Sequence, residues 1–317
     1  MKIFITGATG LFGSYLAREF SKCGEIHALI RPSSSKRLTE DFDFPVVWHV
    51  GDLLDQDFIE EVLGGFDLVI HAAGLVSYDE KDETMLYQIN VKGTASLVNA
   101  VLLSGVKQLI HVSSVAAIGR GSGLKDVDES FKWIDSPLNT AYANSKYYGE
   151  LEAWRGEQEG LNLIVINPSV LLGKVSDDRS STDIYHYLLD KNSYYPVGTI
   201  NYIDVRDAAI LTRHLFEEGA WGERFILNRE ALAYRDFFQT MGKAFGISAP
   251  TKAINPNLLG LVVFFNELLR KIGLTKSPLN KKTAKIAQQK IFFNNKKILQ
   301  LLNYQYRDLA ATFSWAK

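Results

Sequence analysis

Short apolar segments alternate with longer amphipathic ones through the first 170 residues of the chain. Unbroken apolar runs predict strands buried on both faces, and apolar positions every three to four residues predict helices. We expect strands at 2–6, 25–30, 46–50, 67–72, 107–113 and 161–167, and helices at 11–23, 56–63, 83–104 and 141–159. This order predicts parallel βαβ units with right-handed crossovers.

The alternation weakens beyond residue 170. Residues 173–200 hold turn-forming residues and several aromatic rings, a strand–helix unit returns near 201–219, and a further strand follows near 224–228. The remainder is predicted to be mostly helical. We therefore expect an α/β fold, a doubly wound parallel Rossmann-type sheet with a smaller, mostly helical, discontinuous C-terminal lobe. The dinucleotide-binding domain comprises residues 1–167 with about 201–223, and the substrate-binding lobe comprises 168–200 and 224–317.

Charge and composition restrict the kinds of partner. The 317 residues are 46% hydrophobic, enough for a sizeable core, and the net charge of −1 gives no reason to expect nucleic acid as a partner. The single cysteine, Cys23, is predicted to be buried and inert, which suits a reducing cytoplasm. The N-terminus shows no signal peptide, and the longest apolar run, Leu258 to Phe265, is shorter than the roughly 18 residues of a membrane span. We expect a cytoplasmic protein without an integral membrane segment or a metal site, acting on a small molecule.

Three glycines stand between the first strand and the first helix. Gly7 permits a tight turn, Gly10 lets the backbone approach a pyrophosphate, and Gly13 lets the helix pack closely on the strand. Unpaired N–H groups at the start of the helix favour the phosphates. The predicted cofactor contacts of this turn are Gly7, Thr9, Gly10, Leu11, Phe12 and Gly13.

The residue after the second strand bears on the choice of cofactor. NAD sites usually place an acid there for the ribose 2′-hydroxyl, but this chain has Arg31, followed by serines, Lys36 and Arg37. These donors suit a 2′-phosphate, so NADP is preferred over NAD. The alternative is that Arg31 is a solvated loop residue.

Two further strand ends complete the predicted cofactor site. Asp52 and Leu53 follow the third strand, where they could meet the adenine, unless Asp52 only caps the helix near residue 56. The small residues Ala72, Ala73 and Gly74 follow the fourth strand and leave room for the cofactor. His71, just before them, is expected to be a packed strand residue.

Tyr142 and Lys146 are four residues apart in a predicted helix and therefore share one face. A nearby ammonium favours a phenolate and lowers the pKa of a tyrosine, so the pair can move a proton. Such a pair is common by chance, but Ser114 ends the fifth strand 28 residues upstream, where a hydroxyl can polarise a substrate oxygen. Ser113 is the alternative to Ser114.

These motifs resemble those of the extended short-chain dehydrogenases/reductases, also called the NAD-dependent epimerase/dehydratase family. The matching segments are Thr6–Gly13, Asp52–Leu53, His71–Gly74, Asn90–Thr94, Ser113–Ser114, Tyr142–Lys146, Asn167–Val170 and Tyr202–Asp207. The resemblance implies that Tyr142 is the general acid/base, that Lys146 lowers its pKa and binds the nicotinamide ribose, and that Ser114 orients the reacting oxygen. It also implies that the backbone of Pro168, Ser169 and Val170 meets the carboxamide. Asn90 either supports the active-site helix or is an ordinary helical residue.

Departures from the family pattern bear on the reaction. Val115 and Ala116 follow Ser114 where dehydratases carry an Asp-Glu pair, Ile118 replaces a tyrosine of sugar epimerases, and Thr199 stands near the place of their diphosphate-binding arginine. Arg179, Arg224 and Arg235 are candidates to replace that arginine. Asn201–Pro250, Phe292–Lys296 and Arg31 instead resemble the dihydroflavonol-reductase-like branch, which implies carbonyl reduction with NADPH. The alternatives are a nucleotide-sugar epimerase with tightly bound NAD and a catalytically silent protein that senses NADP or binds a partner.

Substrate contacts and assembly are predicted less directly. The candidate substrate residues are Ser77, Tyr78, Ser114, Asn167 and Tyr202. The rings Tyr185, His186, Tyr187, Tyr194 and Tyr195 either line a pocket or pack the lobe. The helices at 83–104 and 141–159 form the usual dimer contact of the family, so a homodimer is possible. The basic segment 270–297 is expected to be a solvated face, with an anionic substrate or membrane surface as the alternative.

Overall fold

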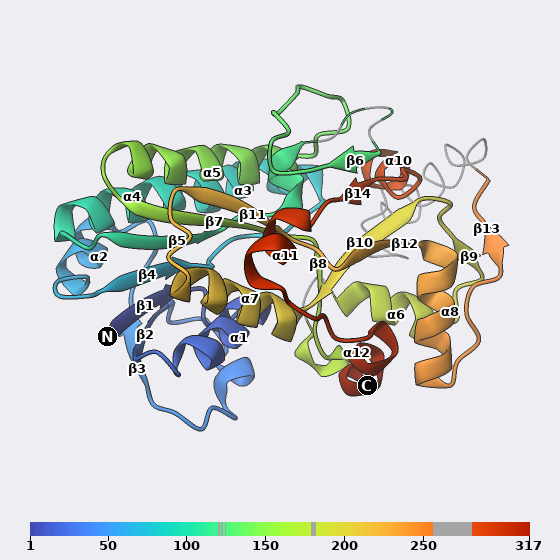
Figure 1. Ribbon diagram of the computed structural model, residues 1–317, viewed down its shortest axis with the longest axis horizontal. Helices are drawn as coiled ribbons and strands as arrows, with labels where there is room; N and C mark the ends of the chain where they lie inside the picture. Colours follow the sequence, from blue (N-terminus) through green and yellow to red (C-terminus); the bar gives the residue numbers. More distant parts are fainter. Residues whose placement is uncertain (120, 122, 124, 179–181, 256–280) are drawn as a thin grey trace.

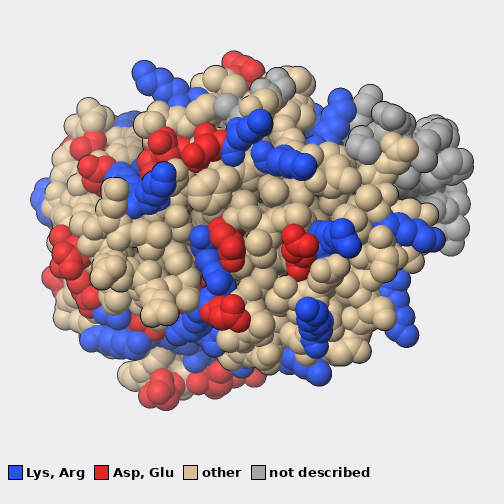
Figure 2. Space-filling model, turned by 45° about the vertical axis from the view of Figure 1, so that its right-hand side comes forward, with Lys and Arg blue, Asp and Glu red and all other residues tan. Residues whose placement is uncertain are grey.

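The computed structural model describes the chain except for residues 120, 122, 124, 179–181 and 256–280. The apolar run Leu258–Phe265, Arg179 and the first part of the basic segment 270–297 lie outside the described residues. Figure 1 shows a central sheet with helices on both faces and, beside it, a smaller lobe. On the face in Figure 2, basic and acidic side chains of the described residues are interspersed, and these residues form no extended patch of a single sign there.

The central sheet consists of seven parallel strands in the order β11-β7-β5-β4-β1-β2-β3. They are β1 (Lys2–Thr6), β2 (Glu25–Ile30), β3 (Val46–Val50), β4 (Leu68–His71), β5 (Gln108–Val112), β7 (Asn162–Pro168) and β11 (Glu223–Leu227). The first six agree with the expected strands to within one residue. The inner strands are buried on both faces, which explains their unbroken apolar sequences.

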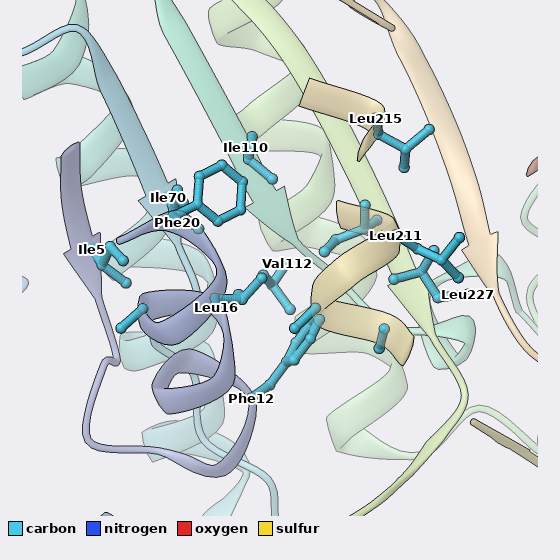
Figure 3. Close-up of a cluster of buried hydrophobic side chains, with 14 of the residues drawn as sticks. Ile5, Phe12, Leu16, Phe20, Ile70, Ile110, Val112, Leu211, Leu215 and Leu227 are labelled. Atoms are coloured by element: carbon cyan, nitrogen blue, oxygen red, sulfur yellow. The ribbon is translucent and has the colours of Figure 1, made fainter. Parts of the chain in front are cut away.

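Helices cover both faces of this sheet. One face carries α1 (Leu11–Phe20) and α7 (Val205–Glu217), and α11 (Lys296–Leu302) packs against α7 and β11. The other face carries α2 (Gln56–Val62), α4 (Gly93–Ser104) and α5 (Ala141–Gln158). Figure 3 shows the core of the first face, where Phe12, Leu16 and Phe20 of α1 and Leu211 and Leu215 of α7 lie over the sheet residues Ile5, Ile70, Ile110, Val112 and Leu227.

The lobe has its own three-stranded sheet and its own core. The sheet has the order β12 (Glu230–Ala233), β10 (Thr199–Asp204), β8 (Val170–Leu172), and the helices α6 (Asp183–Leu189), α8 (Tyr234–Phe245) and α12 (Leu309–Ala316) pack around it. Two small strand pairs join β9 (Tyr194–Tyr195) to β13 (Lys252–Ala253) and β6 (Asp126–Val127) to β14 (Phe292–Phe293). Helix α10 (Lys281–Ile286) precedes β14.

The strand pairing differs from the expected division at two strands. β11 was expected in the lobe, but it forms the edge of the central sheet beside β7. β10 was expected with the Rossmann domain, but it pairs with β8 and β12 of the lobe. Both strands are short, and their partners lie about 30 to 60 residues away along the chain, so hydrophobic pattern alone does not reveal the sheet to which they belong. The division of the chain into two domains otherwise stays a prediction.

Three smaller expectations are also modified. The helix expected at 83–104 is interrupted: α3 (Glu83–Leu86) leads into a π-helical turn (Tyr87–Lys92) and then into α4. Cys23 is only partly buried, and burial raises the pKa of its thiol, which suits an inert residue. Tyr185 is fully buried, and its hydroxyl donates to the Gly173 carbonyl oxygen at 2.9 Å, so this ring packs the lobe.

Candidate active site

The carboxyl ends of β1 and β4 meet where the strand order reverses, and the glycine turn lies between them. Gly7 has φ +76°, and a Cβ atom there would stand 2.6 Å from the backbone of Ala72. A Cβ atom on Gly13 would stand 2.0 Å from the Gly7 carbonyl oxygen. Both positions therefore require glycine, and the crevice beside them is where open parallel sheets bind ligands.

The start of α1 has the chemistry of an anion site. Its N-cap is Gly10, which offers no capping side chain, and its first turn contains no acid. The side chains of Leu11 and Phe12 are buried in the core, so the predicted contacts of these residues can come only from their backbone N–H groups. Unpaired N–H groups beside a glycine that admits a ligand fit the pyrophosphate of a dinucleotide.

The loop after β2 carries three cationic side chains in different settings. Arg31 is exposed, and the Lys36 ammonium lies 4.6 Å from the centre of the Trp48 ring. Arg37, the last donor of the predicted cluster, is engaged within the protein, because its guanidinium donates to the carbonyl oxygens of Ser176 and Asp177. Arg37 thus ties this loop to the segment after β8, whereas the role of Arg31 stays a prediction.

The turn after β3 excludes one of the alternatives. Asp55 is the N-cap of α2 and accepts from the Phe58 N–H at 3.1 Å, so Asp52 is not the cap of that helix. Asp52 is exposed and accepts from the Leu54 N–H at 2.9 Å. Leu53 is buried beneath it and packs on Gly93.

Tyr142 and Lys146 lie on the first turns of α5, as expected. The Thr140 hydroxyl caps the helix by accepting from the Ala143 N–H at 3.1 Å. The Tyr142 ring is buried and meets the Tyr78 ring edge-on at 5.7 Å between centroids. The Lys146 ammonium donates to the Val112 carbonyl oxygen at 2.8 Å, which fixes the pair at the carboxyl end of β5.

The two serines after β5 have different environments. Ser114 is half-buried, and its hydroxyl oxygen accepts from the Ala116 N–H at 3.1 Å. Ser113 is buried, and its hydroxyl has no hydrogen-bond partner in the described part of the chain. The structure thus brings Ser114, Tyr142 and Lys146 to one end of β5, and the crevice beside β1 and β4 adjoins them.

Burial sets the charge states around Lys146. Desolvation lowers the pKa of Lys146 to about 8, and the Glu150 carboxylate acts in the opposite direction. Burial, followed by the Lys146 charge, lowers the pKa of His71 to about 3, and burial also lowers the pKa of His111 well below its usual value. Both imidazoles are therefore neutral near pH 7.

His71 is a packed strand residue, as expected, and its hydrogen bonds define its tautomer. Thr94 donates to the Asn90 carbonyl oxygen at 2.7 Å, so the 2.9 Å contact from His71 Nε2 to the Thr94 hydroxyl oxygen is donated by the imidazole. His71 Nδ1 then accepts from the Thr6 hydroxyl at 2.7 Å, and Thr6 accepts from the Ala73 N–H at 3.2 Å. This chain fastens the end of β4 to β1.

Asn90 supports the active-site helix. Its side chain accepts from the Leu75 N–H at 2.7 Å and donates to the Leu75 carbonyl oxygen at 2.9 Å and to the Ser145 hydroxyl at 2.9 Å. The segment after β4 and α5 are thereby held together. The π-helical turn that contains Asn90 is a recurring feature of functional sites.

A hollow of about 140 Å³ lies at the start of α5, where it is lined by Ala141 and by Tyr78, whose ring meets the Tyr142 ring edge-on. Its described lining residues are Ser77, Tyr78, Asp79, Glu80, Glu83, Thr140, Ala141, Asn144 and Lys282. A second, shallower hollow of about 440 Å³ shares Asn144 and Lys282 with it. The candidate substrate residues Ser77 and Tyr78 line this space, whereas Asn144 and Lys282 were not predicted, because only the fold brings α10 to α5.

Two candidate substrate residues point elsewhere. Tyr202 is 1% exposed, packs edge-on against Phe237 in the core of the lobe and donates to the Glu230 carboxylate at 2.6 Å. Asn167 is fully buried, and its amide group donates to the Ser114 carbonyl oxygen at 3.0 Å and to the Glu150 carboxylate at 2.8 Å. Neither residue lines the hollow at the start of α5.

The segment after β7 offers mainly backbone to a cofactor. The Ser169 N–H and hydroxyl both donate to the Leu227 carbonyl oxygen, at 3.0 and 3.2 Å. Pro168 ends β7, and Val170 begins β8. Their predicted contact with the cofactor stays a prediction, and it is one that their backbone atoms would make.

The chain is similar to known proteins over most of its length. The model of the NAD dependent epimerase/dehydratase family matches residues 3–224. A protein of Synechocystis sp. named "Putative dihydroflavonol 4-reductase" is 31% identical over 310 residues, which cover 94% of this chain and 88% of that protein. Cinnamoyl-CoA reductase 1 of Petunia hybrida is 26% identical over 311 residues, which cover 91% and 92%. The crystal structure of gox2253 superposes with a TM-score of 0.83 at 28% identity and covers 99% of this chain and 96% of that one.

The chain therefore belongs to the NAD-dependent epimerase/dehydratase family of extended short-chain dehydrogenases/reductases. It is an NAD(P)-dependent oxidoreductase of that type, and its cofactor is a nicotinamide adenine dinucleotide. Within the described residues, no helix has the length and apolar character that crossing a membrane requires.

Proposed function

We propose that the protein reduces a carbonyl group, or oxidises the corresponding alcohol, with NADP(H). The observation that carries this proposal is the convergence of Ser114, Tyr142 and Lys146 at the end of β5, next to the glycine turn. The names of the relatives support it, because they describe reductases of dihydroflavonols and cinnamoyl-CoA.

Each residue of the site has a separate role in this reaction. The cofactor, when bound, supplies the hydride. Tyr142 donates its hydroxyl proton to the substrate oxygen, and the Lys146 ammonium stabilises the resulting phenolate. Because the Ser114 oxygen already accepts from the Ala116 N–H, its own hydrogen can be directed to the substrate oxygen. The backbone N–H groups at the start of α1 would hold the pyrophosphate, and Lys146 would hold the nicotinamide ribose.

The preference for NADP rests on the loop after β2. Position 31 holds an exposed arginine where an NAD site would hold an acid, and Lys36 lies nearby on Trp48. A guanidinium and an ammonium favour a 2′-phosphate. Arg31→Asp is expected to weaken NADPH binding about tenfold or more while NADH binding changes little. Equal losses for both cofactors, measured by fluorescence titration, would refute this part of the proposal.

The test of the reaction is a turnover screen with both cofactors. The panel comprises aldehydes, ketones, a dihydroflavonol, a cinnamoyl-CoA thioester and UDP-glucose. The wild-type protein should oxidise NADPH with a carbonyl substrate. Tyr142→Phe should abolish this turnover and leave NADPH binding intact. A fully active Tyr142→Phe variant would sink the proposed mechanism.

Membership of the family keeps sugar epimerisation as a second candidate function. The charges around the hollow disfavour a sugar diphosphate. Its described lining residues include three carboxylates and one lysine, namely Asp79, Glu80, Glu83 and Lys282. Carboxylates repel a diphosphate. Arg224 is engaged by Glu150. Oxidised NAD that copurifies and does not exchange would favour the epimerase. The presence of Ser114, Tyr142 and Lys146 together argues against a catalytically silent protein that only senses the cofactor.

We further propose a cytoplasmic homodimer. The lone, half-buried Cys23 suits a reducing compartment. Leu103 of α4 and Tyr148 and Leu151 of α5 are exposed at 63%, 47% and 44%, and these helices form the dimer contact of the family. Light scattering after gel filtration should give twice the chain mass, and Leu151→Glu should give a monomer.

A further inference from the structure

Glu150 is a buried carboxylate one helical turn beyond Lys146 in α5. It is 3% exposed, and both of its oxygens have partners. One oxygen accepts from the Arg224 guanidinium of β11 at 3.1 Å and from the Trp154 indole N–H at 3.2 Å. The other accepts from the Asn167 amide at 2.8 Å. Removing a carboxylate from water is costly, so a charged group in this position needs such a set of donors.

Asn167 connects Glu150 to the active site. It stands near the end of β7, fully buried, and its amide nitrogen also donates to the Ser114 carbonyl oxygen at 3.0 Å. Ser114 is the residue from which the short helix at Val115–Ile118 begins. A continuous path of hydrogen bonds therefore runs from the carboxylate to the backbone of the serine that directs the substrate oxygen.

The charge of Glu150 has a second effect at Lys146. Among the described residues, the Glu150 carboxylate acts on Lys146, and the Lys146 charge acts on His71 of β4 and His111 of β5. Tyr142 lies one helical turn before the lysine on α5. Both histidines are neutral, and Glu150 is the anionic group that counteracts the burial of Lys146. Arg224, on the far side of Glu150, pairs with the same carboxylate and moderates its effect.

We propose that Glu150 is a positioning residue of the active site, which fixes the Ser114 backbone through Asn167 and places a negative charge one helical turn from Lys146. This inference rests on the proposed roles of Ser114, Tyr142 and Lys146. Glu150 acts on Ser114 through Asn167. Its two effects can be separated, because one depends on the hydrogen bond to Asn167 and the other on the negative charge.

Three variants test the two effects. Glu150→Gln keeps the shape and removes the charge, Asn167→Ala breaks the path to Ser114 and keeps the charge, and Glu152→Gln is the control. Glu152 lies on the same helix, is partly exposed and pairs with Arg155, away from the site. The measurements are the pH profile of NADPH oxidation with 4-nitrobenzaldehyde or the best carbonyl compound of the screen, and hydrogen exchange of the backbone at residues 112–119.

The expected results differ between the variants. Glu150→Gln should move the alkaline limb of the activity profile about one pH unit lower, because Lys146 then loses its proton at lower pH. Asn167→Ala should lower kcat about tenfold at every pH and speed hydrogen exchange at 112–119 without moving the limb. Glu152→Gln should match the wild type in both measurements.

Opposite results would overturn the inference. If the alkaline limb of the pH profile does not move in Glu150→Gln, the charge effect is refuted. If hydrogen exchange at residues 112–119 does not change in Asn167→Ala, the positioning of Ser114 is refuted. If Glu150→Gln does not fold, Glu150→Asp keeps the charge and shortens the reach, so it must lower kcat and leave the limb in place. An active Tyr142→Phe variant, by contrast, would refute the proposed function and not this network.

Discussion

Ser113 and Ser114 are adjacent in sequence, but their surroundings give them different chemistry. The Ser113 hydroxyl is buried without a partner among the described residues, whereas the Ser114 hydroxyl is oriented by the Ala116 N–H at the edge of the crevice. Ser114→Ala should therefore lower kcat about a hundredfold, the usual effect of losing one donor to a developing oxyanion. Ser113→Ala should lower kcat less than threefold, a change of less than about 0.7 kcal/mol in the barrier. Steady-state kinetics that reverse this order would assign the role to Ser113.

Residue type alone separates catalytic from structural positions only in part. The spacing of Tyr142 and Lys146 predicted that they share one face of a helix, and both lie on α5, but the spacing is common by chance and became a site hypothesis only together with Ser114 and the glycine turn. Tyr202 and Asn167 were candidate substrate contacts. The core of the lobe encloses Tyr202, and Glu150 accepts a hydrogen bond from Asn167. Whether a polar side chain at a strand end meets substrate or protein depends on packing partners far away in sequence.

The glycine turn between β1 and α1 shows how an element imposes residue identity. Gly7→Ala should destabilise the protein by about 2–5 kcal/mol, because the new methyl group meets the Ala72 backbone and φ is positive. Gly105 is the matched control, since its φ is +80° and a Cβ atom there meets nothing within 4 Å. Gly105→Ala should cost only about 1–2 kcal/mol. Equal losses in urea unfolding would show that the contact with Ala72 is unimportant.

For the strands, the sequence predicted where each one lies in the chain better than it predicted which strands pair with each other. Six strands of the central sheet agree with their predicted positions, and the inner ones are buried on both faces by helices. β11 was recognised as a strand and assigned to the lobe, since nothing in its own residues records that β7 lies beside it. The π-helical turn was missed for a similar reason, because the Asn90 contacts that accompany it involve Leu75 and Ser145.

Across the whole molecule, a few polar contacts join the two sheets and the C-terminal segment. Arg37 ties the loop after β2 to Ser176 and Asp177 beyond β8. Asp207 of α7 is fully buried and accepts from the Tyr304 hydroxyl and the Arg307 N–H, both at 2.9 Å. These contacts link the cofactor-binding face to the segment after β8 and to the C-terminal segment.

The neutral histidines behind Lys146 make the stability of the whole fold depend on pH. The pKa of His71 is about 3 in the folded protein, below the value of about 6.5 expected for the unfolded chain. Its contribution to stability is therefore fully present above pH 6.5 and is lost as the pH falls towards 3, by up to about 1.4 kcal/mol per pH unit. His71→Gln, which can keep hydrogen bonds to Thr6 and Thr94, should show a shallower loss of unfolding free energy between pH 6.5 and pH 4.

Urea unfolding at several pH values measures this dependence, and His186 supplies the control. Its side chain is exposed on α6, so His186→Gln should lose stability in parallel with the wild type. His111 remains in both variants and, since its pKa is also lowered by burial, some acid sensitivity should persist in His71→Gln. If His71→Gln instead parallels the wild type, protonation of His71 is not what destabilises the protein in acid.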